Sequence, residues 1–264
     1  MRIAVCISGQ PRTWNKCYQT WNNLFSRFDA EVDYFYHLWD FNSLPQILND
    51  LTPQPVSQQE LDDIQSVLKP KKFLIENYEK SMKVMNDIRD AGRKYPLSGG
   101  TPVHWSGSQF YSIMRASQLK RSYELENNIE YDVCFKMRTD LYFTPMVIHH
   151  FVNEFETPAI NTIYSCHNSH SGIFPPFRIG DIFYYSNSIT FDVLSEFYRF
   201  LPIVGIRPFG HDDNPPEVPF TFYIKMMQIK NKRKYVDPKV MRTEEYAVKK
   251  EAQGSGAIGG HELI

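Results

Sequence analysis

The stretch YDVCFKMRTDLYF, residues 131–143, indicates the fold class most directly. Its first seven residues, largely apolar, are typical of a buried strand, and the run ends at a charged pair, Arg138 and Asp140. Placing such a pair at the end of a buried strand is costly unless it meets a partner. Two interpretations stay open: a structural Arg–Asp pair, or a ligand site where Arg138 binds phosphate oxygens and Asp140 binds a divalent cation.

Segments of strand type and helix type alternate on both sides of this run. Short apolar runs predict the strands, and apolar residues at helical spacing predict the helices. The expected strands are residues 3–7, 32–38, 72–76, 131–137, 162–164 and 180–186, and the expected helices are residues 13–28, 58–68, 108–126, 145–157, 189–200 and 216–230. This alternation predicts an α/β fold with a mainly parallel central sheet, right-handed crossovers and helices flanking the sheet.

Segments that contain Gly, Pro and Asn predict the loops, at residues 42–56, 92–107, 167–176 and 210–217. The loop at residues 92–107 is a candidate for a mobile cover over a site. Because no repeat and no clear linker interrupts the chain, we expect a single domain with two lobes over residues 1–250. The Gly-rich end, residues 251–264, is expected to be a flexible tail.

The composition of the 264-residue chain is ordinary for a globular protein, with 42% hydrophobic and 22% charged residues. A net charge of −1 provides no general attraction to nucleic acid or acidic membranes, so we expect no nucleic-acid partner. The four cysteines form no Cys-x-x-Cys pair, which disfavours a zinc or redox motif. Since no apolar run approaches the roughly 18 residues of a membrane span and none resembles a signal peptide, we expect a cytoplasmic protein without a transmembrane segment.

Polar residues follow the first predicted strand directly, in the segment from Ser8 to Arg12. Gly9 permits close approach of the backbone to a ligand, Ser8 can hydrogen-bond a base or ribose, and Arg12 can reach a phosphate. The alternative is an ordinary turn with a solvated arginine. The chain has neither Gly-x-Gly-x-x-Gly nor Gly-Lys-Ser/Thr, which disfavours a dinucleotide fingerprint or a phosphate-binding loop.

A second group of candidates comes from the second strand and the helix at residues 108–126. His37 and Trp39 end the strand, where Trp39 is suited to stack on a base and His37 to line the pocket wall. Ser112 and Arg115 lie off the apolar stripe of the helix and can face a nucleotide. The alternatives are a core tryptophan with a hydrogen-bonded histidine, and a solvated helix face.

The candidates in the later part of the chain are three carboxylates and one histidine. Asp181, Asp213 and Glu217 can deprotonate an acceptor hydroxyl, and His211 can ligate a cation as an imidazole. The alternative for these carboxylates is helix capping, for which Asp213 is well placed.

Taken together, these segments resemble glycosyltransferases of the GT-A fold, in particular a small group of bacterial and viral enzymes that use nucleotide sugars. The likeness rests on residues 3–12, 33–40, 131–141 and 180–186, which match in order over about residues 1–190. The resemblance implies transfer of a sugar from a nucleotide-diphosphate sugar to a glycan, lipid or protein acceptor. It also implies a nucleotide-binding half at residues 1–143 and an acceptor half at residues 144–250.

In the GT-A family an Asp-x-Asp motif binds the divalent cation and the diphosphate of the donor. This chain departs from the pattern, because Arg138 stands at the first Asp and only Asp140 remains. Either Arg138 offsets the diphosphate charge and the enzyme is independent of metal, or Asp140 still binds Mn²⁺ or Mg²⁺ with help from His211.

The residues and the resemblance together give three sets of candidates. The nucleotide-sugar set is Ser8, Gly9, Arg12, His37, Trp39, Ser112, Arg115, Arg138 and Asp140; the candidate bases are Asp181, Asp213 and Glu217; the candidate metal ligands are Asp140 and His211. Inverting and retaining stereochemistry both stay open. The rival hypotheses are a nucleotidyltransferase and a nucleotide- or carbohydrate-binding module that has lost catalysis.

Overall fold

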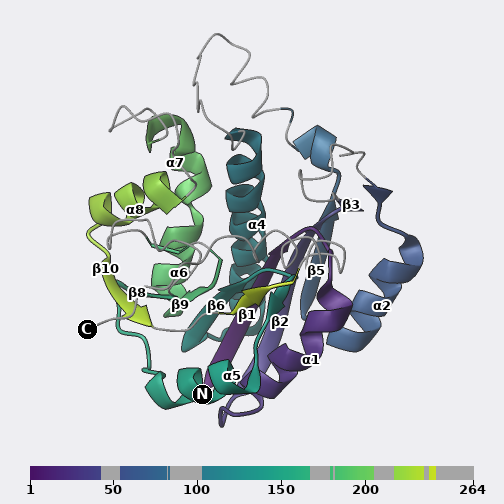
Figure 1. Cartoon of the computed structure of the whole chain (residues 1–264). Coiled ribbons are helices and arrows are strands. Elements are labelled where there is room, and N and C mark those ends of the chain that lie inside the picture. The colour runs from purple at the N-terminus through teal and green to yellow at the C-terminus, as the bar shows by residue number, and fades with distance from the viewer. Residues whose placement is uncertain are drawn as a thin grey trace, which may run out of the picture.

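A computed structural model describes residues 1–42, 54–81, 83, 103–166, 179–180, 182–204, 217–234 and 238–241 (Figure 1). Its main sheet has seven strands: β1 (Arg2–Gly9), β2 (Glu31–Trp39), β5 (Lys72–Glu76), β6 (Val133–Met137), β8 (Thr162–Cys166), β9 (Tyr184–Ser186) and β10 (Lys230–Lys234). Their order is β10-β8-β9-β6-β1-β2-β5. The run that ends at Arg138 therefore lies at the centre of the sheet.

Six of the seven strands run in the same direction. Strand β1 pairs in parallel with β2 and β6, β2 pairs in parallel with β5, and β8 pairs in parallel with β10. The exception is β9, which is antiparallel to both of its neighbours. The predicted α/β class with a mainly parallel sheet is confirmed.

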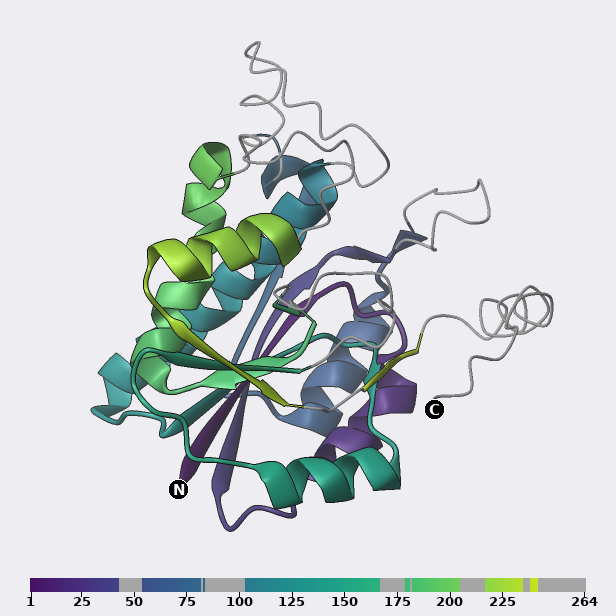
Figure 2. The same cartoon turned by 60° about the vertical axis from the view of Figure 1, so that its left-hand side comes forward.

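The helices cover both faces of the sheet (Figure 2). They are α1 (Trp14–Phe25), α2 (Gln58–Leu68), α4 (Val103–Asn127), α5 (Pro145–Glu154), α6 (Ser188–Ser195), α7 (Phe197–Val204) and α8 (Glu217–Met226). Helices α1, α2 and α5 pack on one face, where β1 contributes Ile3, Val5 and Ile7. Helices α4, α6, α7 and α8 pack on the other face, where β1 contributes Ala4 and Cys6. Because both faces of the central strands are covered, their sequences are largely apolar, with Lys136 in β6 as an exception.

Two short ribbons complete the described structure. Strand β7 (Leu141–Tyr142) pairs with β11 (Lys239–Val240), and β3 (Phe41–Asn42) pairs with β4 (Gln54–Pro55). The indole Nε1 of Trp21 in α1 donates a hydrogen bond to the carbonyl oxygen of Leu141 at 2.5 Å. This bond fixes the segment after Asp140 to the first helix.

Several predicted boundaries are wrong. The helix expected at residues 108–126 already begins at Val103, so the predicted loop ends before that residue. The helix expected at residues 189–200 is divided into α6 and α7, and the one expected at residues 216–230 ends at Met226. Lys230 then begins β10, whose lysine-rich sequence lacks the apolar run by which strands were predicted. Charged side chains of this kind are typical of a strand at a sheet edge.

Other expectations fall on undescribed parts of the chain. The predicted loop at residues 167–176 and the predicted tail lie outside the described residues, as does most of the loop at residues 92–107. Of the loop predicted at residues 210–217, only Glu217 is described, and it begins α8. Among the helices that the structure describes, none combines the length and the apolar character needed to cross a membrane.

Candidate functional site

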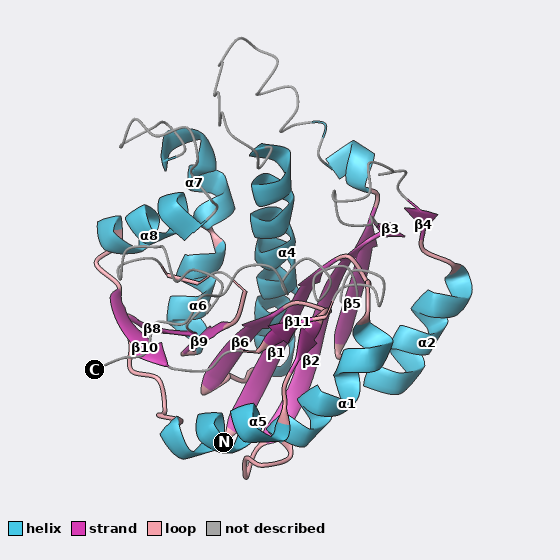
Figure 3. Cartoon of the chain, viewed as in Figure 1, coloured by secondary structure: helices cyan, strands magenta, loops and turns pink. Residues whose placement is uncertain are grey.

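The carboxyl ends of the parallel strands meet at one edge of the sheet (Figure 3). From β1 the chain proceeds through β2 to β5 on one side, and then returns to place β6 on the other side of β1. Open α/β sheets bind ligands at such a switch point, in the crevice outside the carboxyl ends of the strands. The segments that follow β1 and β6 here are residues 10–13 and 138–140, so the topology brings Arg12 together with Arg138 and Asp140.

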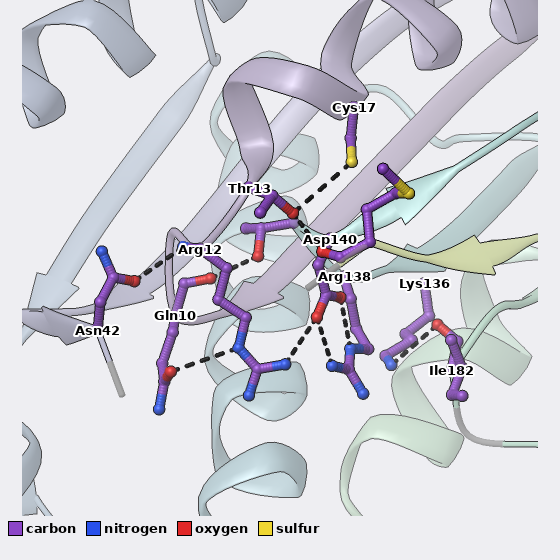
Figure 4. Close-up of polar contacts among 11 residues, drawn as sticks. Gln10, Arg12, Thr13, Cys17, Asn42, Lys136, Arg138, Asp140 and Ile182 are labelled. Atoms are coloured by element: carbon purple, nitrogen blue, oxygen red, sulfur yellow. Dashed lines mark hydrogen bonds and ion pairs between the residues drawn. The ribbon is translucent and has the colours of Figure 1, made fainter. Parts of the chain in front are cut away.

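Arg12, Arg138 and Asp140, called here the Arg–Asp–Arg cluster, form one ion-paired group (Figure 4). Arg138 donates from Nε to Asp140 Oδ1 at 2.8 Å and from NH2 to Oδ2 at 2.6 Å. Arg12 donates from NH1 to Asp140 Oδ2 at 2.7 Å. Both oxygens of the carboxylate are therefore engaged by guanidinium groups, and the cluster carries one net positive charge.

Exposure differs sharply within the Arg–Asp–Arg cluster. The side chain of Asp140 is 0% exposed, whereas those of Arg138 and Arg12 are 16% and 30% exposed. Burial alone would raise the pKa of Asp140, but the two guanidinium groups outweigh burial and hold that pKa well below its usual range. The carboxylate is thus ionised at neutral pH and faces inward, while the positive charges reach the surface.

The backbone around the cluster is held in an unusual conformation. Gly9 has φ +122°, and Arg12 has φ +50°, a left-handed conformation that is unfavourable for any residue other than glycine. The side-chain oxygen of Asn42 accepts a hydrogen bond from the Arg12 backbone N–H at 2.8 Å and so helps to hold this turn. Such strained positions concentrate at functional sites, where the surrounding structure holds them in place.

Three further hydrogen bonds fix the loop that carries Asp140. The hydroxyl of Thr139 donates to the carbonyl oxygen of Gln10, which joins the loop after β6 to the loop after β1. The backbone N–H of Met241 donates to the carbonyl oxygen of Asp140 at 2.7 Å, and the hydroxyl of Thr13 donates to the Met241 carbonyl oxygen. Segments from the start, middle and end of the chain therefore position the cluster.

His37, Glu76, Ser112 and Arg115 form a second polar group, called here the His37–Glu76 cluster, at the carboxyl ends of β2 and β5. The ring of His37 lies with Nδ1 2.7 Å from Ser112 Oγ and Nε2 3.0 Å from Glu76 Oε2. Arg115 donates from NH2 to the other Glu76 oxygen at 2.8 Å. The sequence predicted His37, Ser112 and Arg115 as parts of one nucleotide-binding site, and the structure brings these three side chains together around Glu76.

Protonation states in the His37–Glu76 cluster follow from its contacts. Hydrogen bonds from His37, Tyr111 and Arg115 outweigh burial and lower the pKa of Glu76 to about 2. Burial lowers the pKa of His37 below its ordinary value, with Glu76 acting in the opposite direction. A neutral imidazole that donates from Nε2 to Glu76 and accepts at Nδ1 from Ser112 satisfies both contacts.

We expect Glu76→Gln to remove part of the acid sensitivity of the fold. Because the folded-state pKa of Glu76 is about 2, below the ordinary 4.5, its ionised form stabilises the protein above about pH 4.5. That stability is lost as pH falls from about 4.5 towards about 2. In urea unfolding, the free-energy difference between wild type and Glu76→Gln should therefore shrink as pH falls from 5 to 3. The exposed Glu130→Gln serves as the control for the substitution itself. A difference between wild type and Glu76→Gln that does not change with pH would contradict the assignment.

Trp39 lies beside this second cluster as an apolar wall. It is only 2% exposed, its ring stacks on Tyr111 at a centroid distance of 5.5 Å and an interplanar angle of 21°, and it meets His37 edge-on at 5.0 Å. The base-stacking role predicted for Trp39 stays a prediction, and Tyr111 is its described stacking partner.

The structure adds residues that the sequence analysis missed. Glu76 ends β5 at the same edge as the other candidates, so its strand-end position was the available signal. Lys136 in β6 is buried and donates from Nζ to the carbonyl oxygen of Ile182 at 3.1 Å, which ties β6 to the segment before β9. A lysine within an apolar strand run was a comparable signal, because an unpaired buried charge is costly.

The remaining candidates are not placed. Asp181, His211 and Asp213 lie outside the described residues, and Glu217 begins α8 with its side chain also undescribed. In the portion of the chain that the structure describes, no three or more His, Cys, Asp or Glu side chains are grouped as a metal centre requires. The groups around Asp140 are guanidinium groups, which cannot ligate a cation. The described surroundings of Asp140 therefore do not fit a Mn²⁺ or Mg²⁺ site.

Comparison with known proteins gives structural matches only. No family model and no curated protein sequence matches the chain. Similar structures include a glycosyltransferase involved in the glycosylation of the major capsid of PBCV-1, at 9% identity and a TM-score of 0.43, with 89% of this chain and 82% of that chain covered. Mouse xyloside xylosyltransferase 1, in its apo form, matches at 10% identity and a TM-score of 0.35, with 88% and 84% covered.

Proposed function

We propose that the chain is a glycosyltransferase that transfers a sugar from a nucleotide-diphosphate sugar to a carbohydrate or glycoconjugate acceptor. The observation that carries the proposal is the convergence of Arg12 and Arg138 on Asp140 at the switch point between β1 and β6. This arrangement supports a diphosphate-binding site, because planar guanidinium groups match phosphate oxygens in pairs. The resemblance of four ordered sequence segments to GT-A enzymes supports a sugar nucleotide as the diphosphate ligand.

The nucleoside would lie beside the diphosphate, over the carboxyl ends of β1 and β2. Ser8 is the register partner of His37 there, and Gly9 directly follows Ser8. The His37–Glu76 cluster supplies polar groups for a base or ribose, and Trp39 supplies an apolar wall. In this assignment residues 1–143 form the donor half, and residues 144–250 form the acceptor half.

In the proposed reaction, an acceptor hydroxyl oxygen forms a bond to C1 of the donor sugar. The bond between C1 and the terminal phosphate oxygen breaks, and its electron pair stays on that oxygen. The nucleoside diphosphate leaves with this charge, which Arg12 and Arg138 would stabilise. The proton of the acceptor hydroxyl goes to a carboxylate, for which Asp181, Asp213 and Glu217 are the proposed candidates. Both stereochemical outcomes share this balance of atoms.

A thermal-shift screen of nucleotide-diphosphate sugars against the full chain tests the proposal. A donor present at about 100 times its Kd stabilises the folded protein by about 2.7 kcal/mol, which raises Tm by roughly 5–10 °C. Arg2→Met is the control for loss of an arginine away from the site, because Arg2 lies at the amino end of β1 and the site lies at the carboxyl end. That variant should respond to the donor as the wild type does.

The products of the stabilising donor then separate the rival functions. Slow release of free sugar without an acceptor supports a transferase. Transfer of a nucleoside monophosphate would instead identify a nucleotidyltransferase. Binding without either reaction would identify a binding module, and both of these results contradict the proposal.

A further inference from the structure

We propose that the Arg–Asp–Arg cluster binds the donor diphosphate without a divalent cation, with Arg138 supplying the charge that a cation would otherwise supply. This inference rests on the proposed function and specifies how its site works. In it, Asp140 is a positioning residue that aims the two arginines, and it contacts neither the phosphates nor a metal ion.

The carboxylate of Asp140 is already hydrogen-bonded to both arginines, which disfavours a metal ion there. A carboxylate offers about four lone-pair positions. Arg138 uses one position on Oδ1 and one on Oδ2, and Arg12 uses a second on Oδ2. A Mg²⁺ ion requires a bare oxygen at about 2.0–2.1 Å and near-ideal octahedral surroundings. Three of the four positions on Asp140 are thus taken, and the fourth lies on Oδ1, which is wholly buried and already accepts a hydrogen bond from Arg138, so it offers no such surroundings.

The net charge of the Arg–Asp–Arg cluster also disfavours a cation. Two guanidinium groups and one carboxylate leave one net positive charge before any ligand binds. Like charges 4 Å apart repel by about 4 kcal/mol at an effective dielectric constant of 20, so an added divalent cation meets strong repulsion. A diphosphate carries the opposite sign and is attracted by the same groups. The cluster therefore favours the anion over the cation.

The orientation of the cluster favours an anion, because its arginines and not its carboxylate reach the surface. The two arginine side chains are partly exposed, whereas the carboxylate lies beneath them, so the accessible face of the cluster is cationic. Thr139 and Met241 hold the backbone on either side of Asp140. The arginines are thus held by their ion pairs before the ligand arrives, which reduces the ordering cost of binding.

Isothermal titration of the full chain with UDP and with GDP tests the inference, first in EDTA and then in excess MnCl₂. We expect the better-bound nucleotide to bind in EDTA with a Kd within about 3-fold of its value in Mn²⁺, a difference under 1 kcal/mol. Binding that requires Mn²⁺, or that tightens about 10-fold or more with it, would overturn the inference and leave the proposed function standing. If neither UDP, GDP nor the nucleoside diphosphate of the donor found in the thermal-shift screen binds under either condition, the proposed function and this inference are both overturned.

Variants at position 138 make the test sharper. Arg138→Asp recreates Asp-x-Asp and should lose about 100-fold in affinity in EDTA, with recovery in Mn²⁺. Arg138→Lys keeps the charge without the planar group, and should lose about 10-fold with no recovery in Mn²⁺. Wild-type affinity of Arg138→Asp in EDTA would contradict the inference. If that variant does not fold, recovery of Arg138→Lys in Mn²⁺ would contradict it equally well.

Discussion

Arg12→Met should lower kcat/KM for sugar transfer about 100- to 1,000-fold, the loss typical when one charge-stabilising donor is removed. Arg12 is the more exposed of the two arginines on Asp140 and the one contributed by the loop after β1. Its removal takes a positive charge from the proposed diphosphate site. Steady-state kinetics with the donor found in the thermal-shift screen would measure the effect.

The fold should survive this substitution. Asp140 keeps both hydrogen bonds from Arg138, at 2.8 and 2.6 Å, so its charge stays compensated. We therefore expect a stability loss of only about 1–2 kcal/mol, which corresponds to a few degrees in Tm.

Arg2→Met is again the matched control, because Arg2 pairs with Glu31 at the other end of the same strands. Its activity should stay at the wild-type level. If Arg12→Met retains full activity, or if both variants lose activity equally, the diphosphate does not bind at Arg12.

The central strands could be predicted because they are buried on both faces. Residues 3–7 are apolar on the α1 side and on the α4 side, and residues 133–137 are so except for the buried Lys136, so the run itself marks the strand. Strand β10 could not be predicted in this way, because its lysines leave no apolar run. The direction of β9 also depends on its neighbours β6 and β8, and short strands carry no local signal of direction.

The candidate site could likewise be predicted from the sequence only where local sequence marks its residues. Local sequence marked Arg138 and Asp140 as an unusual pair, and the structure confirms that they are ion-paired. Local sequence did not show that Arg12 joins this pair, because the contact between Arg12 and Asp140 spans 128 positions and depends on the parallel register of β1 with β6. Glu76 was missed for a related reason. Its partner His37 lies on a neighbouring strand, and only the pairing of β2 with β5 brings the two together.

The largest stability effect is expected at Lys120, within the packing of α4 against α6. Its side chain is 0% exposed, and Nζ lies 2.9 Å from Glu124 Oε2 and 2.9 Å from Asp192 Oδ1. Burial alone would lower the pKa of Lys120, but the surrounding anionic groups outweigh burial and raise it. Lys120→Met would leave two carboxylates without a counter-charge. We expect a loss of about 3–5 kcal/mol and a Tm lower by about 10 °C.

Lys72→Met is the control for this effect, because Lys72 also pairs with α4, through Glu126, but at a more exposed position. Its Tm should change far less than that of Lys120→Met. Since the loss comes from uncompensated charge, adding Asp192→Asn to Lys120→Met should restore part of the stability, a coupling that urea unfolding of the single and double variants would measure. If the double variant instead loses the sum of both single losses, the network is held by packing around Lys120 and its charge is unimportant.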